Sequence, residues 1–133
     1  MTSGTAEIFY VDDSPDDLFL ANYQMREGGF SFALKTFSTG IAAIMDMERR
    51  AARGEALPFM LIADYYMPIT DGPELFRLIR ANGQLAGVLL ASCSGGDDPH
   101  DRKAAEEAGA DFILGKPLDL ALCQDLVSRR QIA

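Results

Sequence analysis

Five short apolar runs, separated by longer segments with helical periodicity, restrict the fold of this chain more than any other feature. The runs lie at residues 7–11, 32–37, 59–63, 88–93 and 112–114. A continuous apolar run such as FMLIA, at 59–63, is typical of a parallel strand buried on both faces. Strands that alternate with helices form βαβ units, whose helices cover both faces of a parallel sheet. The sequence therefore predicts an α/β fold, a doubly wound five-stranded parallel sheet flanked by five helices.

The segments between the apolar runs carry the signals of helices. In the first segment Ser14 is a predicted N-cap, Pro15 a first-turn residue, and Gly28 and Gly29 the end of the helix. The other four helices are predicted from an opening proline or from apolar residues at helical spacing. These markers are Ile41, Ile44 and Met45; Pro73, Leu75, Leu78 and Ile79; Asp98, Pro99, Ala104, Ala105 and Ala108; and Leu118, Leu122, Leu126 and Val127.

Length and charge exclude several function classes. With 133 residues, 48% of them hydrophobic and 24% charged, the chain is expected to form one globular domain, residues 1–133. A formal charge of −8 argues against direct binding to nucleic acid, which needs clustered Lys and Arg, and against docking on an anionic membrane. No apolar run approaches the roughly 20 residues that span a bilayer, and no basic flank marks a signal peptide. Cys93 and Cys123 lack metal-ligand spacing, so we interpret them as reduced thiols of a cytoplasmic protein.

The clearest functional signal is a set of polar residues placed where the predicted strands end. Ligands of such sheets bind outside the carboxyl ends of the strands, so residues that follow different strands are expected to meet there. Taken singly, each of these polar residues has an ordinary alternative role. The nearby Asp16 and Asp17 are interpreted only as acids that favour a helix N-terminus. Taken together, three crowded acids cost free energy unless something neutralises them. The set comprises Asp12 and Asp13 after the first strand, Asp64 after the third, Ser92 or Ser94 in the fourth, and Lys116 after the fifth.

Phosphoryl transfer to a carboxylate is the chemistry that needs this set. Mg²⁺ is a hard cation that prefers a few carboxylates together with water and phosphoryl oxygens. Asp12, Asp13 and Asp64 are expected to bind it, while a free oxygen of Asp64 attacks phosphorus to form an aspartyl phosphate. Catalysis of such a transfer is mostly positioning and charge neutralisation, to which Lys116 and a serine hydroxyl would contribute.

These residues resemble the receiver domain of two-component response regulators. The motif D-x-x-M-P-x-x-D-G of that family stands here as Asp64, Met67, Pro68, Asp71 and Gly72, and the double acid as Asp12 and Asp13. The run EAGADFILGKP, at 107–117, resembles the family's A-G-A…K-P ending, and the resemblance covers residues 7 to 130. It implies a flavodoxin-like fold.

The resemblance also implies a role for each matching residue. Asp64 corresponds to the phosphoacceptor. Asp13 and Asp64 would ligate Mg²⁺ directly, Asp12 through water, and Tyr66 through its backbone carbonyl. Lys116 corresponds to the family's lysine, with a cis peptide expected before Pro117. Met67, Pro68 and Gly72 would shape the loop.

Three positions need a separate interpretation. A gapless comparison places the family's hydroxyl at Ser94, whereas strand composition alone would accept Ser92, with Gly95 and Gly96 as an insertion. The family usually has an aromatic residue three places before the lysine, where this chain has Ile113, so the usual swing of that ring is not expected. Tyr66 lies two places after the acceptor, where its ring is expected to slow the hydrolysis of the phosphoryl group.

The predicted function is that of a signalling module and not of an enzyme. A histidine kinase or a phosphotransfer protein would phosphorylate Asp64 and switch the fourth strand and helix. The next partner would be a downstream protein or an output domain outside this chain, with a homodimer left open. An aspartyl-nucleophile phosphohydrolase of the haloacid dehalogenase type is the alternative, but Tyr66 stands where such enzymes carry their acid. A flavodoxin-like cofactor site is disfavoured because DDSPDD, at 12–17, would repel a phosphate.

Overall fold

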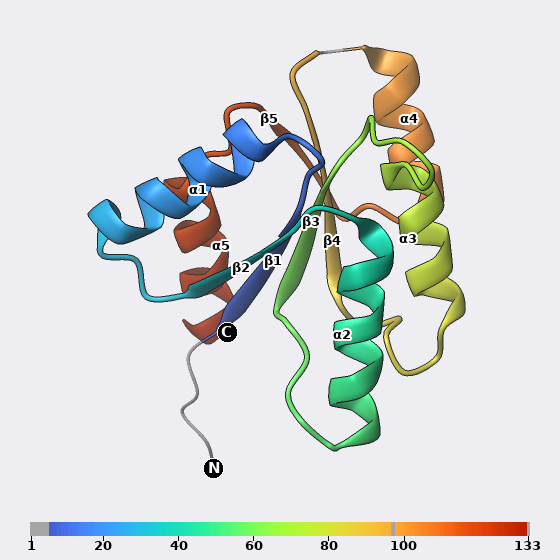
Figure 1. The fold of residues 1–133 in the computed structure, drawn as a ribbon, viewed down its shortest axis with the longest axis horizontal. Helices are drawn as coiled ribbons and strands as arrows, with labels where there is room; N and C mark the ends of the chain where they lie inside the picture. The colour runs from blue at the N-terminus through green and yellow to red at the C-terminus, as the bar shows by residue number, and fades with distance from the viewer. Residues whose placement is uncertain (1–5, 97, 133) are drawn as a thin grey trace.

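The computed structural model describes residues 6–96 and 98–132 as one parallel sheet between two layers of helices. Strands and helices alternate along the chain (Figure 1). The strands are β1 (Glu7–Val11), β2 (Ala33–Phe37), β3 (Met60–Asp64), β4 (Leu89–Ser94) and β5 (Phe112–Gly115). The helices are α1 (Pro15–Gly28), α2 (Gly40–Ala52), α3 (Gly72–Ala81), α4 (Pro99–Ala108) and α5 (Leu120–Ile132). The predicted fold is confirmed.

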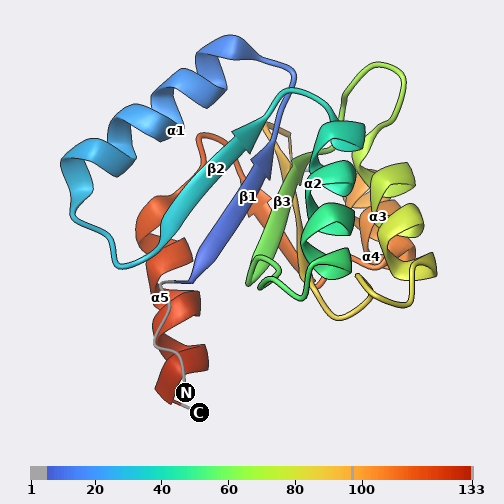
Figure 2. The ribbon, with the colours of Figure 1, turned by 60° about the horizontal axis from the view of Figure 1, so that its bottom comes forward.

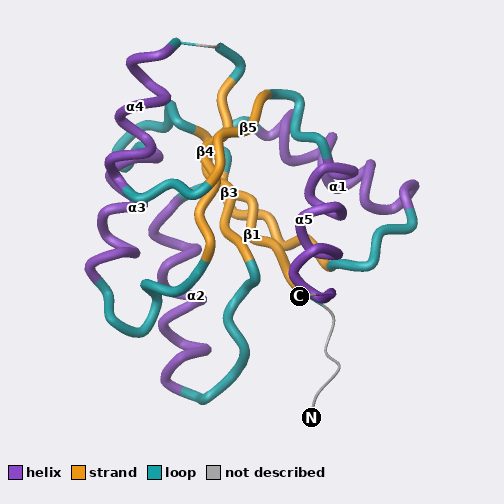
Figure 3. Tube along the Cα trace, turned by 180° about the vertical axis from the view of Figure 1, so that it is seen from behind, coloured by secondary structure: helices purple, strands orange, loops and turns teal. Residues whose placement is uncertain are grey.

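The order of the strands is β2-β1-β3-β4-β5, and every neighbouring pair is parallel. Helices α1 and α5 cover one face of the sheet, and α2, α3 and α4 cover the other (Figures 1 and 3). Figure 2 shows β2 beside β1 and β1 beside β3, so the chain reverses its direction of winding after β2 and crosses back over β1 to reach β3. Such a reversal places a crevice at the carboxyl ends of β1 and β3.

Alternate side chains of each strand enter two separate apolar cores. Ile8, Tyr10 and Ile62 pack with Cys123 of α5 on one face. On the other face Phe9 and Leu61 are fully buried, together with residues of α2, α3 and α4. This alternation follows from the period of two residues along a strand. It fixes which face of the sheet each residue beyond the strand end approaches.

Helix boundaries follow the capping signals closely. The Ser14 side chain accepts a hydrogen bond from the Asp17 backbone N–H, and Gly29 closes α1 in the left-handed region at φ 64°. Asp98 caps α4 by accepting from the His100 N–H. These are the residues that cap preferences favour at helix ends. The last helix begins at Leu120, so Leu118 precedes it as a buried loop residue.

Apolar spacing located the helices and identified part of their buried faces, since Leu75, Ile79, Ala105, Ala108 and Val127 are buried, but other marked residues are exposed. Ile41, Met45 and Leu78 are each 46% to 60% exposed. In α2 the buried positions are instead Gly40, Ala43, Asp46 and Met47. The buried face of α2 thus consists of two small residues, Met47, and an acid that is paired with Lys35, Arg49 and Arg50.

Candidate functional site

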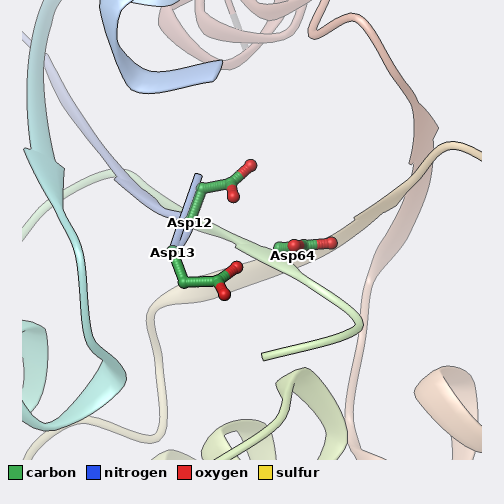
Figure 4. A group of neighbouring side chains, drawn as sticks. All are labelled: Asp12, Asp13 and Asp64. Atoms are coloured by element: carbon green, nitrogen blue, oxygen red, sulfur yellow. The ribbon is translucent and has the colours of Figure 1, made fainter. Parts of the chain in front are cut away.

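Three carboxylates meet where β1 and β3 end. Val11 and Ala63 are paired across the two strands, so Asp12 and Asp64, the next residues, reach the same edge. One carboxylate oxygen of each of Asp12, Asp13 and Asp64 lies within 4.8 Å of the others. Figure 4 shows the three side chains side by side at the strand ends. The structure thus brings together the acids that the sequence pointed to, in a group that fits the oxygen-rich donor set of a hard metal ion.

The three acids differ in their exposure to water. Asp12 is fully buried and Asp64 is 7% exposed, whereas Asp13 is exposed. The carboxylate of Asp64 is therefore held on a rigid strand end, and the cluster opens to solvent on the side of Asp13. A ligand can enter from that side.

Lys116 is the cation that faces this cluster. Its Nζ lies 2.9 Å from Asp12 Oδ2, 2.9 Å from Asp17 Oδ2 and 3.3 Å from Asp64 Oδ2. The Lys116 backbone N–H donates to the Ser94 carbonyl at 3.1 Å, which extends the pairing of β4 with β5 beyond the strands. The peptide between Lys116 and Pro117 is cis, as the family resemblance implied.

The carboxylates differ in the ease with which they take up a proton. Burial raises the pKa of Asp64 above its ordinary value, although the charge of Lys116 opposes this shift. Burial acts in the same direction on Asp12, but hydrogen bonds from the Ser14 N–H, Lys116 and Tyr10 outweigh it and hold the pKa of Asp12 below its usual range. Burial would lower the pKa of the Lys116 ammonium, but its bonds to Asp17 and Asp12 and the charge of Asp64 raise that pKa. Asp12 and Lys116 are therefore the firmly charged members of the site.

Ser94 and Ser92 lie on the same face of β4 at different depths. Ser94 ends the strand, where its Oγ accepts a hydrogen bond from the Gly96 N–H at 3.2 Å. Ser92 is 3% exposed and is paired with Ala63 and Ile113 in the sheet. A hollow of about 290 Å³ is lined by Ser94, Ile113 and Lys116, among others. Ser94 and Lys116 thus line the same hollow, while Ser92 lies deeper in the sheet.

The loop after β3 is shaped by Gly72. A Cβ at this position would lie 2.9 Å from the Asp64 carbonyl oxygen and 3.2 Å from the Tyr65 Cα, so any side chain would displace the backbone that carries Asp64. The Gly72 N–H donates to the Tyr65 carbonyl at 3.1 Å. Asp71 caps α3 through the Glu74 N–H. Within this motif Gly72 and Asp71 hold the loop closed behind Asp64.

Tyr66 turns toward α4. Its side chain is 61% exposed, its hydroxyl donates to Asp101 of α4, and its ring lies 4.7 Å from the Tyr65 ring. The bond to Asp101 raises the pKa of Tyr66 to about 12. The Tyr66 backbone N–H acts on Asp64 in the direction that lowers the pKa of its carboxylate. Tyr66 therefore links the loop after β3 to the fourth helix.

Two residues of the site were missed by the sequence analysis. Tyr10 is buried, and its hydroxyl donates to Asp12 Oδ2 at 2.7 Å. A tyrosine two places before a strand-end acid lies on the same face of the strand, which is a signal the sequence contains. Asp17, interpreted only as an acid of the helix N-terminus, also pairs with Lys116. That contact joins residues 99 positions apart, and no local pattern reveals it.

Comparison with known proteins identifies the family. The family model of the response regulator receiver domain matches residues 8–128. The transcriptional regulatory protein PrrA of Mycobacterium tuberculosis is 32% identical over 122 residues, 92% of this chain and 47% of the relative. A two-component response regulator of Oryza sativa is 28% identical over 84% of this chain and 83% of its own length. The chain spans about half the length of PrrA.

Solved structures agree with this assignment. The receiver domain of a sensor histidine kinase from Pseudomonas aeruginosa PAO1, with a magnesium ion coordinated in its active site cleft, has a TM-score of 0.76 and 25% identity, covering 95% of this chain and 97% of that one. The chemotaxis protein CheY4 of Vibrio cholerae has a TM-score of 0.77 at 20% identity, covering 95% and 98%, which supports the fold alone. Sequence, fold and strand-end cluster agree, and the chain belongs to the receiver domains of two-component response regulators.

Proposed function

We propose that Asp64 is the phosphoacceptor of this receiver domain and that its phosphorylation requires Mg²⁺. The observation that carries the proposal is the group of three carboxylates within 4.8 Å of one another, with the Lys116 ammonium beside it. Asp12, Asp13, Asp64 and the Tyr66 carbonyl are the residues that would hold the ion. When bound, Mg²⁺ neutralises charge on the carboxylates and on the phosphoryl oxygens.

The transfer itself needs one nucleophilic oxygen and a fixed cation. A carboxylate oxygen of Asp64 attacks phosphorus in line, and the new O–P bond forms as the bond from phosphorus to the donor breaks. The leaving group, the imidazole of a phosphohistidine or acetate from acetyl phosphate, departs with the bonding electron pair. Lys116 holds the charge of the transferred group, and Ser94 donates a hydrogen bond to one of its oxygens.

The partners follow from this chemistry. A histidine kinase or a histidine phosphotransfer protein supplies the phosphoryl group, and a downstream protein or an output domain reads the phosphorylated state. The module acts by autocatalytic phosphotransfer with slow autodephosphorylation. Cys93 and Cys123 are buried free thiols, which suits a reducing compartment, and we place the protein in the cytoplasm. Within the described residues no helix has the length and apolar composition needed to cross a membrane.

Intact mass measurement tests the function directly. Incubation with acetyl phosphate and Mg²⁺ should add a single phosphoryl group, and chelation of the metal should prevent the addition. A protein that stays unmodified with Mg²⁺ at millimolar concentration would contradict the proposal. Continuous release of inorganic phosphate without a stable adduct would favour the phosphohydrolase instead.

Substitution of the two serines should identify the hydroxyl that responds to the phosphoryl group. A hydroxyl that accepts a bond still carries a hydrogen that it can donate, and Ser94 lies at the strand end beside Lys116. Ser94→Ala should accept phosphate but lose the amide chemical-shift changes of residues 94–108 on addition of beryllium fluoride, a phosphoryl mimic. Ser92→Ala should keep these changes. The opposite pattern would assign the role to Ser92.

Tyr66 should control how long the phosphoryl group survives. We expect the aspartyl phosphate of Tyr66→Ala to be lost severalfold faster than that of the parent, because the ring beside the acceptor loop restricts the access of water. Tyr66→Phe keeps the ring and removes the bond to Asp101, so it should stay closer to the parent. The rates are measured by mass after removal of the phosphodonor. An unchanged rate in Tyr66→Ala would show that the ring does not protect the phosphoryl group.

A further inference from the structure

Lys116 has one carboxylate partner that lies outside the acidic cluster. Its Nζ contacts Asp12, Asp17 and Asp64 at 2.9, 2.9 and 3.3 Å. Asp12 and Asp64 belong to the group of acids that fits a metal ion, and Asp17 does not. The oxygens of Asp12 and Asp64 are therefore shared between the lysine and a ligand of the site, whereas the contact with Asp17 is independent of that ligand.

The position of Asp17 is fixed by the start of α1. The Asp17 backbone N–H donates to the capping hydroxyl of Ser14, which places the aspartate in the first helical turn. From there its carboxylate accepts a hydrogen bond from the ammonium of Lys116, the residue that follows β5. Its side chain is 38% exposed and that of Lys116 is 20% exposed, so the pair lies at the rim of the site. A helix terminus packed on the sheet is a rigid support for such a contact.

The ammonium of a lysine needs fixed partners to stay in one place. The ammonium is a point charge on a flexible four-carbon chain, so its place beside a reacting group depends on fixed partners. In a loaded site Asp12 and Asp64 would hold the metal and the phosphoryl group. The remaining fixed acceptor of Lys116 is then the carboxylate of α1.

We propose that Asp17 is a positioning residue that holds the Lys116 ammonium beside Asp64 during phosphorylation. This inference rests on the proposed phosphoacceptor function of Asp64. Asp17 also draws positive charge away from the phosphoryl group, and that effect alone would make Asp17→Ala faster than the parent. The two effects change the phosphorylation rate of Asp17→Ala in opposite directions, so a measurement of that rate distinguishes them.

The test compares two alanine variants that remove the same charge from neighbouring positions. Asp17→Ala should lower the initial rate of phosphoryl incorporation from acetyl phosphate about two- to fivefold at saturating Mg²⁺, the range expected for a partly exposed ion pair. Asp16→Ala is the matched control: Asp16 is also a first-turn acid of α1 and is exposed, so the rate should stay at the parent value. Asp17→Glu keeps a carboxylate at the position and should restore most of the rate.

A Lys116→Ala background shows whether Asp17 acts through the lysine. There, Asp17→Ala should cause no further loss of rate. In the metal-free protein the two substitutions should also shift the melting temperature by less together than the sum of their separate shifts, because each removes the partner of the other. This second readout does not depend on phosphorylation.

Four results would overturn the inference. Asp17→Ala with a rate equal to or above that of the parent would show that the contact does not position Lys116 for the reaction. An equal loss in the Lys116→Ala background, or additive melting shifts, would show that Asp17 acts on the fold and not on the lysine. A parent protein that takes up no phosphoryl group would overturn the proposed function together with the inference, whereas a labelled parent confines any failure to Asp17.

Discussion

Asp64→Asn should accept no phosphoryl group under conditions in which the parent gains one. The amide keeps the shape of the side chain but carries no charge and is a far poorer nucleophile, so the O–P bond cannot form at a useful rate. The substitution also removes one charge from a crowded group of acids, so the variant should fold and melt at or above the temperature of the metal-free parent. Intact mass before and after incubation with acetyl phosphate and Mg²⁺ measures the effect.

Asp71→Asn is the matched control for this result. Asp71 lies in the same loop and caps α3 by accepting from the Glu74 N–H at 2.9 Å. Asparagine is an equally good N-cap, so the loop should keep its conformation and the variant should be labelled like the parent. If Asp64→Asn gains the same mass as the parent, with the group on another residue, Asp64 is not the acceptor.

Mg²⁺ should stabilise the folded parent strongly, because the unfolded chain does not hold the three acids together. A ligand at one hundred times its dissociation constant adds about 2.7 kcal/mol to the free energy of unfolding. Asp13→Ala should lose most of this gain, since Asp13 is the exposed member of the cluster and would supply one of the ligand oxygens. Without metal the same variant should be as stable as the parent or more so, because one repulsive charge is gone. Thermal unfolding with and without Mg²⁺ measures both effects.

The variant Asp16→Ala distinguishes binding of Mg²⁺ at the acidic cluster from a general effect of removing a negative charge. It removes an exposed acid three positions from Asp13 and lies outside the cluster, so it should keep the full gain from Mg²⁺. A melting temperature of the parent that does not move at millimolar Mg²⁺ would show that the acidic cluster does not bind the metal.

Local patterns of the sequence predict most of the fold. A strand buried on both faces must be apolar throughout, so β3 stands out as MLIA before its final acid. Ser14, Pro15 and Gly29 mark the ends of α1, because cap geometry depends on residues next to one another in the chain. The same reasoning could not assign the buried face of α2, since that depends on which neighbours it packs against.

The sequence by itself determined the fold class, the family, and which acids and which lysine lie at the carboxyl edge of the sheet, because the ends of parallel strands meet there in any fold of this topology. The tertiary structure alone decided how these groups pair. It placed Asp17 beside Lys116, which is 99 positions away in the sequence. It also placed the Tyr10 hydroxyl against Asp12 and the Tyr66 hydroxyl against Asp101. It also placed Ser94 at the strand end and Ser92 in the sheet. Such contacts depend on the register of the strands and the docking of the helices, which are properties of the whole chain and not of any segment of it.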